Sequence, residues 1–279
     1  MKNQIARFLC QLGLAILILL PAGSALAEPK RLLVVTTTAG FPHSSIPTAE
    51  KILAKVGEKN GLFTVDYVRS GPRPKDQAEA TAWMAKMTKD LAEKMNLEAL
   101  KQYDGVIFAN TTGILPLPDK QGFLNWVKSG KAFVGMHSAS DTFHAQEGVD
   151  PYIEMLGGEF RTHHAQAGVE CLVQDPKHPA TRQLGESYCI AKEEIYLMKN
   201  YDSSKVHELL VLDKHPNQKS LFGRFPIAWC KKYGQGNVFY TSLGHNESVW
   251  EDSTYQKHIE GGIKWALGLE SGDIAPQVK

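Results

Sequence analysis

Four apolar runs along this chain each end in a polar cluster, and this pattern restricts the available folds more than any other feature. The runs are residues 31–38, 103–109, 131–136 and 236–243. Short runs rich in β-branched and aromatic residues that alternate with helical patterns are typical of buried parallel strands. Ligands of such sheets bind beyond the carboxyl ends of the strands. The sequence therefore predicts an α/β fold in which polar residues from distant segments meet at one edge of the sheet.

Residues 1–27 have the organisation of a secretory signal peptide. Lys2 and Arg7 form a short basic region before an almost wholly apolar stretch from Phe8 to Pro21. Ala25-Leu-Ala27 then offers a small-residue cleavage site. The stretch is short for a membrane span, and an uncleaved anchor is the alternative. We expect cleavage after Ala27, export to the periplasm or the medium, and no stable membrane insertion of the mature chain.

Residues 28–279 are expected to form one domain, with its core at about 31–269. No low-complexity linker or internal repeat divides them, and roughly 250 residues can bury a single core. The near-neutral net charge of +1 gives no reason to expect nucleic acid as a partner. The cysteines of this part are odd in number and widely spaced, which argues against a disulfide framework but leaves one disulfide open. They are Cys171, Cys189 and Cys230.

Hydrophobic periodicity predicts the remaining elements of the domain. The expected helices are residues 47–61, 91–100, 116–130 and 255–267. An additional strand is expected at residues 64–69. Residues 71–88 are expected to form a long polar connection, with partial helix as an open alternative. Four later segments are expected to be strands that follow one another without intervening helices and pair antiparallel at the edge of the sheet. They are residues 168–173, 194–198, 206–212 and 226–233. Tyr233-Gly-Gln-Gly236 is a hairpin signal.

Several common catalytic motifs are missing from the sequence. No Gly-x-Gly-x-x-Gly or phosphate-binding loop follows the first strand, so no nucleotide cofactor is expected. No Gly-x-Ser-x-Gly is present, which argues against an α/β-hydrolase. Residues 134–139 have the strand–turn–helix form of a nucleophile elbow, but the elbow position holds His137 and no cysteine is near it. Acyl transfer by a cysteine is therefore not expected.

Histidines carry the remaining chemistry. His137 and His245 follow two of the apolar runs and His163 follows a glycine-containing segment, so we predict these three as acid/base residues or metal ligands. His43 and Asn110 follow the other two runs and are predicted to hold substrate hydroxyls. The further candidates for substrate binding are Asp141, Arg161, Glu194 and Trp250. The histidines predicted to be solvated are His178, His207, His215 and His258.

The sequence leaves the presence of a metal open. It contains no His-x-His or His-x-x-x-His pair, so a site for a divalent metal such as zinc or iron would be assembled from remote segments. Its candidate ligands are the histidines His137, His163 and His245, with Asp141, Glu194 or Glu247 as the carboxylate partner. The alternative is a metal-free acid/base pair in which a carboxylate orients a histidine.

Aromatic residues near these segments fit a carbohydrate ligand, because sugar rings present apolar C–H faces that stack on aromatic side chains. Trp250, in the loop after His245, is the aromatic residue expected to line a pocket. Trp229 and Tyr240 are expected in the core. The other aromatic residues near these segments are Phe41, Phe143 and Tyr196.

With these residues the chain resembles the ThuA-like (trehalose utilisation) family, a branch of the class I glutamine amidotransferase-like superfamily. The segments that carry the resemblance, specific in their joint order, are residues 40–46, 135–143, 156–163, 194–196, 226–229 and 234–245. The resemblance implies a flavodoxin-like three-layer sandwich with a mainly parallel central sheet and added antiparallel strands in the second half. It also implies that His137 stands near the place of the amidotransferase cysteine. Relatives are linked to the catabolism of disaccharides and keto-sugars.

Three functions remain open on these grounds. The leading hypothesis is an exported enzyme that acts on a disaccharide, glycoside or keto-sugar derivative as a hydrolase, lyase or isomerase. A ketone on the sugar acidifies the adjacent carbon, so proton abstraction by histidine could act without paired carboxylates. The alternatives are a non-catalytic sugar-binding protein and a structural metal protein. The sequence does not indicate the oligomeric state.

Overall fold

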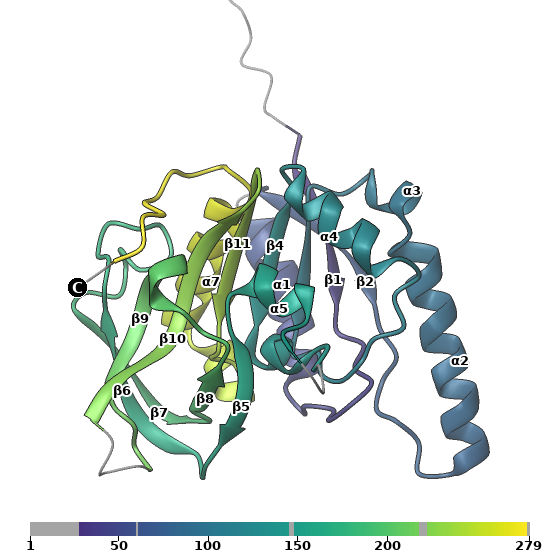
Figure 1. The fold of residues 1–279 in the computed structure, drawn as a ribbon, viewed down its shortest axis with the longest axis horizontal. Coiled ribbons are helices and arrows are strands. Elements are labelled where there is room, and N and C mark those ends of the chain that lie inside the picture. Colours follow the sequence, from purple (N-terminus) through teal and green to yellow (C-terminus); the bar gives the residue numbers. More distant parts are fainter. Residues whose placement is uncertain (1–27, 60, 145–147, 218–221, 278–279) are drawn as a thin grey trace, which may run out of the picture.

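The computed structural model describes residues 28–59, 61–144, 148–217 and 222–277. Within them a nine-stranded sheet has the order β2-β1-β3-β4-β11-β10-β9-β6-β7, and a separate two-stranded sheet pairs β5 with β8 (Figure 1). The predicted signal peptide lies outside the described residues. None of the helices in the described part of the chain combines the length and apolar character that a membrane crossing needs.

One half of the large sheet is parallel, as predicted. Its strands are β1 (Lys30–Val35), β2 (Phe63–Val68), β3 (Gly105–Ala109), β4 (Ala132–Met136) and β11 (Gly236–Thr241). Neighbouring strands of this half pair in parallel throughout. Every residue of β3 and β4 is buried, as expected for strands with helices on both faces. All five carboxyl ends therefore lie at the same edge, which is the lower edge in Figure 1.

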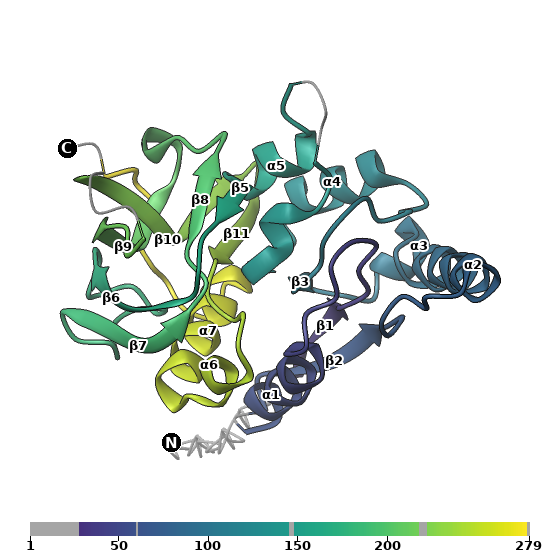
Figure 2. The same ribbon diagram turned by 90° about the horizontal axis from the view of Figure 1, so that it is seen from below.

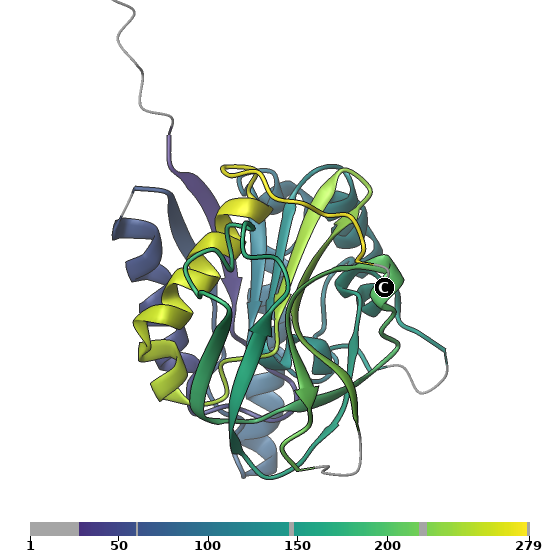
Figure 3. The same ribbon diagram turned by 90° about the vertical axis from the view of Figure 1, so that its left-hand side faces the viewer.

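The other half of the large sheet is antiparallel and forms the side that faces the viewer in Figure 3. Its strands are β10 (Phe222–Tyr233), β9 (His207–Lys214), β6 (Ala167–Val173) and β7 (Ser187–Glu193). The predicted hairpin at Tyr233–Gly236 joins β10 to β11. The expectation of antiparallel strands added in the second half is thus confirmed.

One of the added strands was assigned to the wrong sheet by the sequence. Residues 194–198 were expected at the edge of the large sheet, whereas β8 (Tyr196–Lys199) pairs antiparallel with β5 (Glu159–His163) in the small sheet. Neither β5 nor β7 was predicted. Both alternate buried and exposed residues over short polar sequences, so their apolar content is too low to mark them as strands.

Helices cover the two faces of the sheet (Figure 2). One face carries α1 (Ile46–Lys59), α6 (Glu247–Glu251) and α7 (Ser253–Ala266). The other carries α2 (Gln77–Lys94), α3 (Leu97–Leu100), α4 (Lys120–Lys128) and α5 (Pro151–Leu156). Two short 3-10 helices are η1 (His137–Asp141) and η2 (Ser203–Lys205). The buried apolar residues form two clusters, one under each layer of helices, which completes the predicted three-layer sandwich.

The segment predicted as a polar connection is largely the helix α2. Asp76 caps its first turn by accepting hydrogen bonds from the N–H groups of Ala78 and Glu79, both at 2.9 Å. Trp83, Met87 and other buried residues recur on one face at helical spacing. The predicted helix at 91–100 is wrong in its bounds, because α2 ends at Lys94 and α3 begins at Leu97.

Four histidines predicted to be solvated are buried instead, with exposed fractions of at most 2%. They are His178, His207, His215 and His258. Partners distant in the sequence explain the burial of His258. Its Nδ1–H donates to the carbonyl oxygen of Ala180 at 2.8 Å, and its Nε2 accepts from the Thr241 hydroxyl at 3.2 Å. A buried polar ring with both nitrogens hydrogen-bonded carries little penalty.

Burial of His258 predicts that the fold loses stability in acid. Desolvation lowers its pKa from 6.5 to about 4, so below pH 6.5 the unfolded chain binds a proton that the folded chain does not. The free energy of unfolding should therefore fall by about 2 kcal/mol from this residue alone between pH 7.5 and pH 5. Urea unfolding at the two pH values measures the loss. In His258→Gln the fall in the free energy of unfolding should be smaller by that amount. An identical fall in the variant would contradict the role of buried His258 in the pH dependence.

Candidate active site

Three of the predicted histidines meet at the carboxyl-terminal edge of the parallel strands. His43 follows β1, His137 directly follows β4 and His245 follows β11. Their ring centroids are 4.7 Å (His43–His137), 5.2 Å (His137–His245) and 5.3 Å (His43–His245) apart. The structure therefore brings these imidazoles together as predicted, while their chemical roles stay a prediction.

The loop that carries His43 is held against the loop after β3. The N–H groups of Ala39 and Gly40 both donate to the carbonyl oxygen of Thr112, at 3.0 and 3.2 Å. A side chain on Gly40 would lie 2.7 Å from the Thr112 hydroxyl, so the close approach depends on glycine. This contact directs the following residues across the ends of β1 and β3 and leaves His43 almost buried.

His137 occupies the elbow that the sequence indicated, between β4 and η1. Its φ angle is +50°, a left-handed conformation that is uncommon outside glycine and is found most often at functional sites. The side chain is completely buried. Its Nδ1 lies 2.8 Å from the carbonyl oxygen of Ser242. A carbonyl can only accept, so Nδ1 carries the proton and the lone pair of this neutral ring is on Nε2.

The Nε2 atom of His137 lies at the centre of the cluster. His43 Nε2 is 3.1 Å from it, His245 Nδ1 is 3.3 Å from it and the hydroxyl of Tyr196 is 2.8 Å from it. Tyr196 was noted only as a nearby aromatic residue, because nothing in its local sequence shows that β8 reaches the histidines. The site is thus built from both sheets.

Glu194 connects the buried imidazoles to the predicted residue His163. One carboxylate oxygen, Oε2, lies 3.2 Å from His245 Nδ1 and 3.8 Å from His137 Nε2. The other, Oε1, lies 3.0 Å from His163 Nδ1. The Glu194 side chain is only 8% exposed, whereas that of His163 is 43% exposed. A single carboxylate therefore orients the accessible His163 and the less exposed His245, and it lies close to the buried His137.

Glu193, which the sequence analysis missed, fixes the loops that carry these groups. It accepts hydrogen bonds from the backbone N–H of Gly244 at 2.8 Å and of Glu194 at 2.7 Å. Burial raises the pKa of its carboxyl from 4.5 to about 7. The sequence signal that could have identified Glu193 is the adjacent carboxylate pair Glu193-Glu194 shortly before Tyr196.

Burial and hydrogen bonding shift the pKa values of the clustered histidines in opposite directions. Burial, reinforced by the nearby His245, lowers the pKa of His43 to about 4, and burial lowers the pKa of His137 well below 6.5. A hydrogen bond to Glu194 raises the pKa of His245. The inner two rings are therefore neutral at physiological pH, and His245 is the member of the cluster that holds a proton most readily.

Two residues predicted to bind substrate are instead buried beneath the loops that form this edge. Asn110 is completely buried, and its amide donates to the Ser45 hydroxyl at 2.9 Å and to the Gly244 carbonyl oxygen at 3.1 Å. Trp250 is also completely buried, and its indole N–H donates to the same carbonyl oxygen at 2.8 Å. Trp250 therefore packs in the core under the His245 loop, contrary to the expectation that it lines a pocket.

The remaining candidates are not members of the cluster. Asp141 forms an ion pair with His144, Arg161 is exposed on β5, and Glu247 begins α6, where a hydrogen bond from Ser44 lowers the pKa of its carboxyl. Of the predicted metal ligands, His137 and His245 have donor atoms within 4.8 Å of one another and of two further residues. Those two residues are Glu194, one of the three carboxylate partners considered, and His43. The predicted ligands His163 and Glu247 are not among the four.

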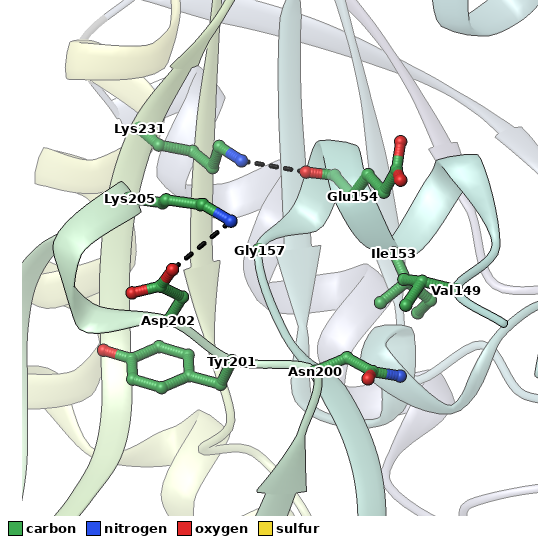
Figure 4. A pocket seen from close by; sticks show the side chains of 9 residues that line it. All are labelled: Val149, Ile153, Glu154, Gly157, Asn200, Tyr201, Asp202, Lys205 and Lys231. Carbon is green, nitrogen blue, oxygen red and sulfur yellow. Dashed lines mark hydrogen bonds and ion pairs between the residues drawn. The ribbon is translucent and has the colours of Figure 1, made fainter.

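Two cavities differ in their relation to this edge. A cavity of about 420 Å³ between β1, β2 and α1 is lined by His43, Pro47, Glu50 and Arg69, among others. Another of about 480 Å³ lies between α5, the β8–β9 connection and β10, where Lys205 pairs with Asp202 (Figure 4). None of the site residues predicted from the sequence lines the second cavity. Of these two cavities, it is the first that adjoins the histidine cluster, through His43.

Comparisons with known proteins agree with this architecture. The ThuA family, described as trehalose utilisation, matches residues 31–266. A ThuA-like protein from Parabacteroides merdae is 19% identical, with a TM-score of 0.68 over 90% of this chain and 94% of its own. One from Bacteroides uniformis is 21% identical, with a TM-score of 0.63 over 88% and 95%.

The fold also occurs inside a larger protein. A β-galactosidase from Bacillus circulans sp. alkalophilus is 12% identical with a TM-score of 0.51, over 90% of this chain and 32% of its own. A comparison with curated protein sequences finds no match. The family match spans most of the chain, so the chain belongs to the ThuA family, which is associated with trehalose utilisation.

Proposed function

We propose that this protein is an exported enzyme that processes a disaccharide, a glycoside or a keto derivative of either. The observation that carries the proposal is the gathering of His43, His137, His163 and His245 around one buried carboxylate, that of Glu194. Of these residues, His43 also lines a cavity. A cavity of about 420 Å³ is within the usual range for small-molecule sites. The association of the family with trehalose utilisation supports a carbohydrate substrate, and the composition of residues 1–27 supports export.

Phe41 offers an apolar surface for a sugar ring. Its side chain is 65% exposed and its ring centroid lies 5.0 Å from that of His43. An exposed aromatic ring next to polar donors is the usual arrangement for binding the C–H face of a sugar. The exposure of Phe41 and its contact with His43 support a sugar-binding surface next to the histidine edge.

His163 is the histidine best suited to move a proton to and from the substrate. Its Nδ1 lies 3.0 Å from Glu194 Oε1 and 3.0 Å from the carbonyl oxygen of His164. Both partners only accept, so Nδ1 carries the proton and Nε2 has the lone pair that acts as a base. The exposure of this side chain leaves it accessible to a substrate.

The proposed reaction starts from a glycoside oxidised to a ketone at C3. The ketone acidifies the hydrogen at C2, which His163 removes to give an enolate whose charge a protonated His245 stabilises. The enolate then expels the aglycone by breaking the bond between C1 and the glycosidic oxygen, and that oxygen takes the proton from His163. Addition of water across the resulting double bond completes a net hydrolysis without a change of oxidation state.

Turnover of paired substrates tests this function. Purified protein is incubated with a 3-keto-disaccharide and with its unoxidised form, and products are identified by mass spectrometry. We expect hydrolysis of the keto form only, with kcat lowered about 100-fold in His163→Ala because a general base is lost. The exposed neighbour His164→Ala serves as the matched control.

The opposite outcomes are equally clear. Equal turnover in wild type and His163→Ala would remove the proposed role of that residue. Binding of the disaccharides in calorimetry without any product would identify a sugar-binding protein instead of an enzyme.

A further inference from the structure

We infer that His43, His137, His245 and Glu194 form a binding site for one divalent transition-metal cation of the zinc or iron class. The inference deepens the proposed function and rests on it for the catalytic role of the ion, whereas binding of the ion can be measured without any substrate. Four donor atoms from four separate segments converge there, all within 4.8 Å of one another.

The spacing of the donors matches the edges of a coordination polyhedron. His43 Nε2 and His137 Nε2 are 3.1 Å apart, His137 Nε2 and His245 Nδ1 are 3.3 Å apart, and His245 Nδ1 and Glu194 Oε2 are 3.2 Å apart. Ligands about 2.0–2.1 Å from a tetrahedral zinc ion are separated by roughly 3.3 Å. Three of the six donor pairs therefore lie at about the distances that a bound ion requires. Of the remaining pairs, His137 Nε2 and Glu194 Oε2 are 3.8 Å apart, and all four atoms lie within 4.8 Å of one another.

The proton on His137 leaves its inner nitrogen suited to coordination. Because Nδ1–H donates to the Ser242 carbonyl oxygen, Nε2 presents a lone pair to three neighbours within 3.3 Å. That lone pair can accept one well-aligned hydrogen bond, whereas a cation lets several nitrogens direct their lone pairs to one point. A backbone carbonyl that fixes the tautomer of a metal-binding histidine is a common feature of such sites.

The surrounding residues hold the other donors in the same way. The second oxygen of Glu194 is engaged by His163 Nδ1 at 3.0 Å, and His43 Nδ1 lies 3.4 Å from the Ser138 hydroxyl. Imidazole and carboxylate donors together favour zinc or iron over calcium or magnesium. Three neutral imidazoles and one carboxylate would leave a positive charge on a bound divalent ion. With the ion bound, this charge would replace that of a protonated His245 in stabilising the enolate oxygen of the proposed reaction.

Metal content and metal titration test the inference on the full mature chain. Protein prepared in rich medium is analysed for metals, stripped with a chelator and titrated with Zn²⁺ and Fe²⁺ by calorimetry, and with Co²⁺ by visible absorption. We expect one ion per chain and a visible Co²⁺ spectrum. His245→Ala and Glu194→Gln should each weaken binding by more than about 100-fold, since even outer-shell changes weaken metal sites by 10–100-fold. His164→Ala, outside the four donors, should bind as the wild type does.

Each outcome decides the inference. No stoichiometric binding of any of the three ions by the folded wild type, or unchanged binding in both donor variants, would overturn it. If a donor variant fails to fold by circular dichroism, the wild-type stoichiometry and Co²⁺ spectrum still decide. Bound metal without sugar turnover would keep the site and overturn the proposed function, whereas turnover that survives complete chelation would keep the function and overturn the metal's role in it.

Discussion

Glu194→Gln is expected to lower kcat/KM for the keto-disaccharide about 1,000-fold while leaving the fold intact. The carboxylate reaches His163 at 3.0 Å and His245 at 3.2 Å, so the proposed base and the proposed enolate-stabilising group lose their common partner together. Loss of a positioned acid/base system is worth about 10²–10⁴ in rate. The neutral amide also removes the group that raises the pKa of His245, and the protonated fraction of that ring should fall at pH 7. Steady-state kinetics over pH 5–9 measure both effects.

A matched variant separates this effect from a general loss of buried charge. Glu208 is also a buried glutamate, but it pairs with Arg224 and Tyr201 on the antiparallel half of the sheet. Glu208→Gln should keep its kcat and pH profile, even if its unfolding midpoint falls. Equal losses of kcat in the two variants would show that Glu194 has no special role in the reaction.

Trp250→Ala is expected to destabilise the protein by about 3–5 kcal/mol, the usual range for truncating a large buried aromatic residue. The ring is completely buried and packs edge-on against Tyr255, with centroids 5.3 Å apart. Its indole N–H also holds the Gly244 carbonyl oxygen next to His245. The variant should therefore lose both stability and the position of His245. Urea unfolding measures the first effect and Co²⁺ absorption the second.

Trp250→Phe is the control for this substitution. Phenylalanine keeps most of the apolar contact and removes only the hydrogen bond, so a loss of about 1–2 kcal/mol is expected. If Trp250→Ala and Trp250→Phe were equally stable, packing in this part of the core would contribute less than its burial implies.

The histidine edge was predictable because strongly apolar parallel strands fix the position of the residues that follow them. His137 and His245 come one and four residues after β4 and β11, so finding the strands was almost enough to place them. The order of the parallel and antiparallel halves followed from the helices between the early strands and their absence between the late ones.

The rest of the site depends on contacts that no local pattern encodes. Glu194 and Tyr196 reach the histidines because β8 pairs with the polar strand β5, with an irregular register between Phe160 and Thr162. Burial of His258 likewise depends on Ala180 and Thr241. A polar side chain is buried when distant partners are available to it, and a single sequence does not reveal those partners. In contrast, the Asp76 cap and the spacing of Trp83 and Met87 were readable signals that the helix α2 fills most of a segment for which only partial helix was considered.

The placement of β11 has a consequence for how the protein acquires activity. This strand comes last in the chain, yet it lies inside the large sheet between β4 and β10 and carries His245 to the site. A growing chain that has produced only the first four parallel strands thus lacks one of the converging imidazoles. The proposed activity would therefore require nearly complete synthesis, and we expect a product truncated before β11 to lack it even if the amino-terminal half folds.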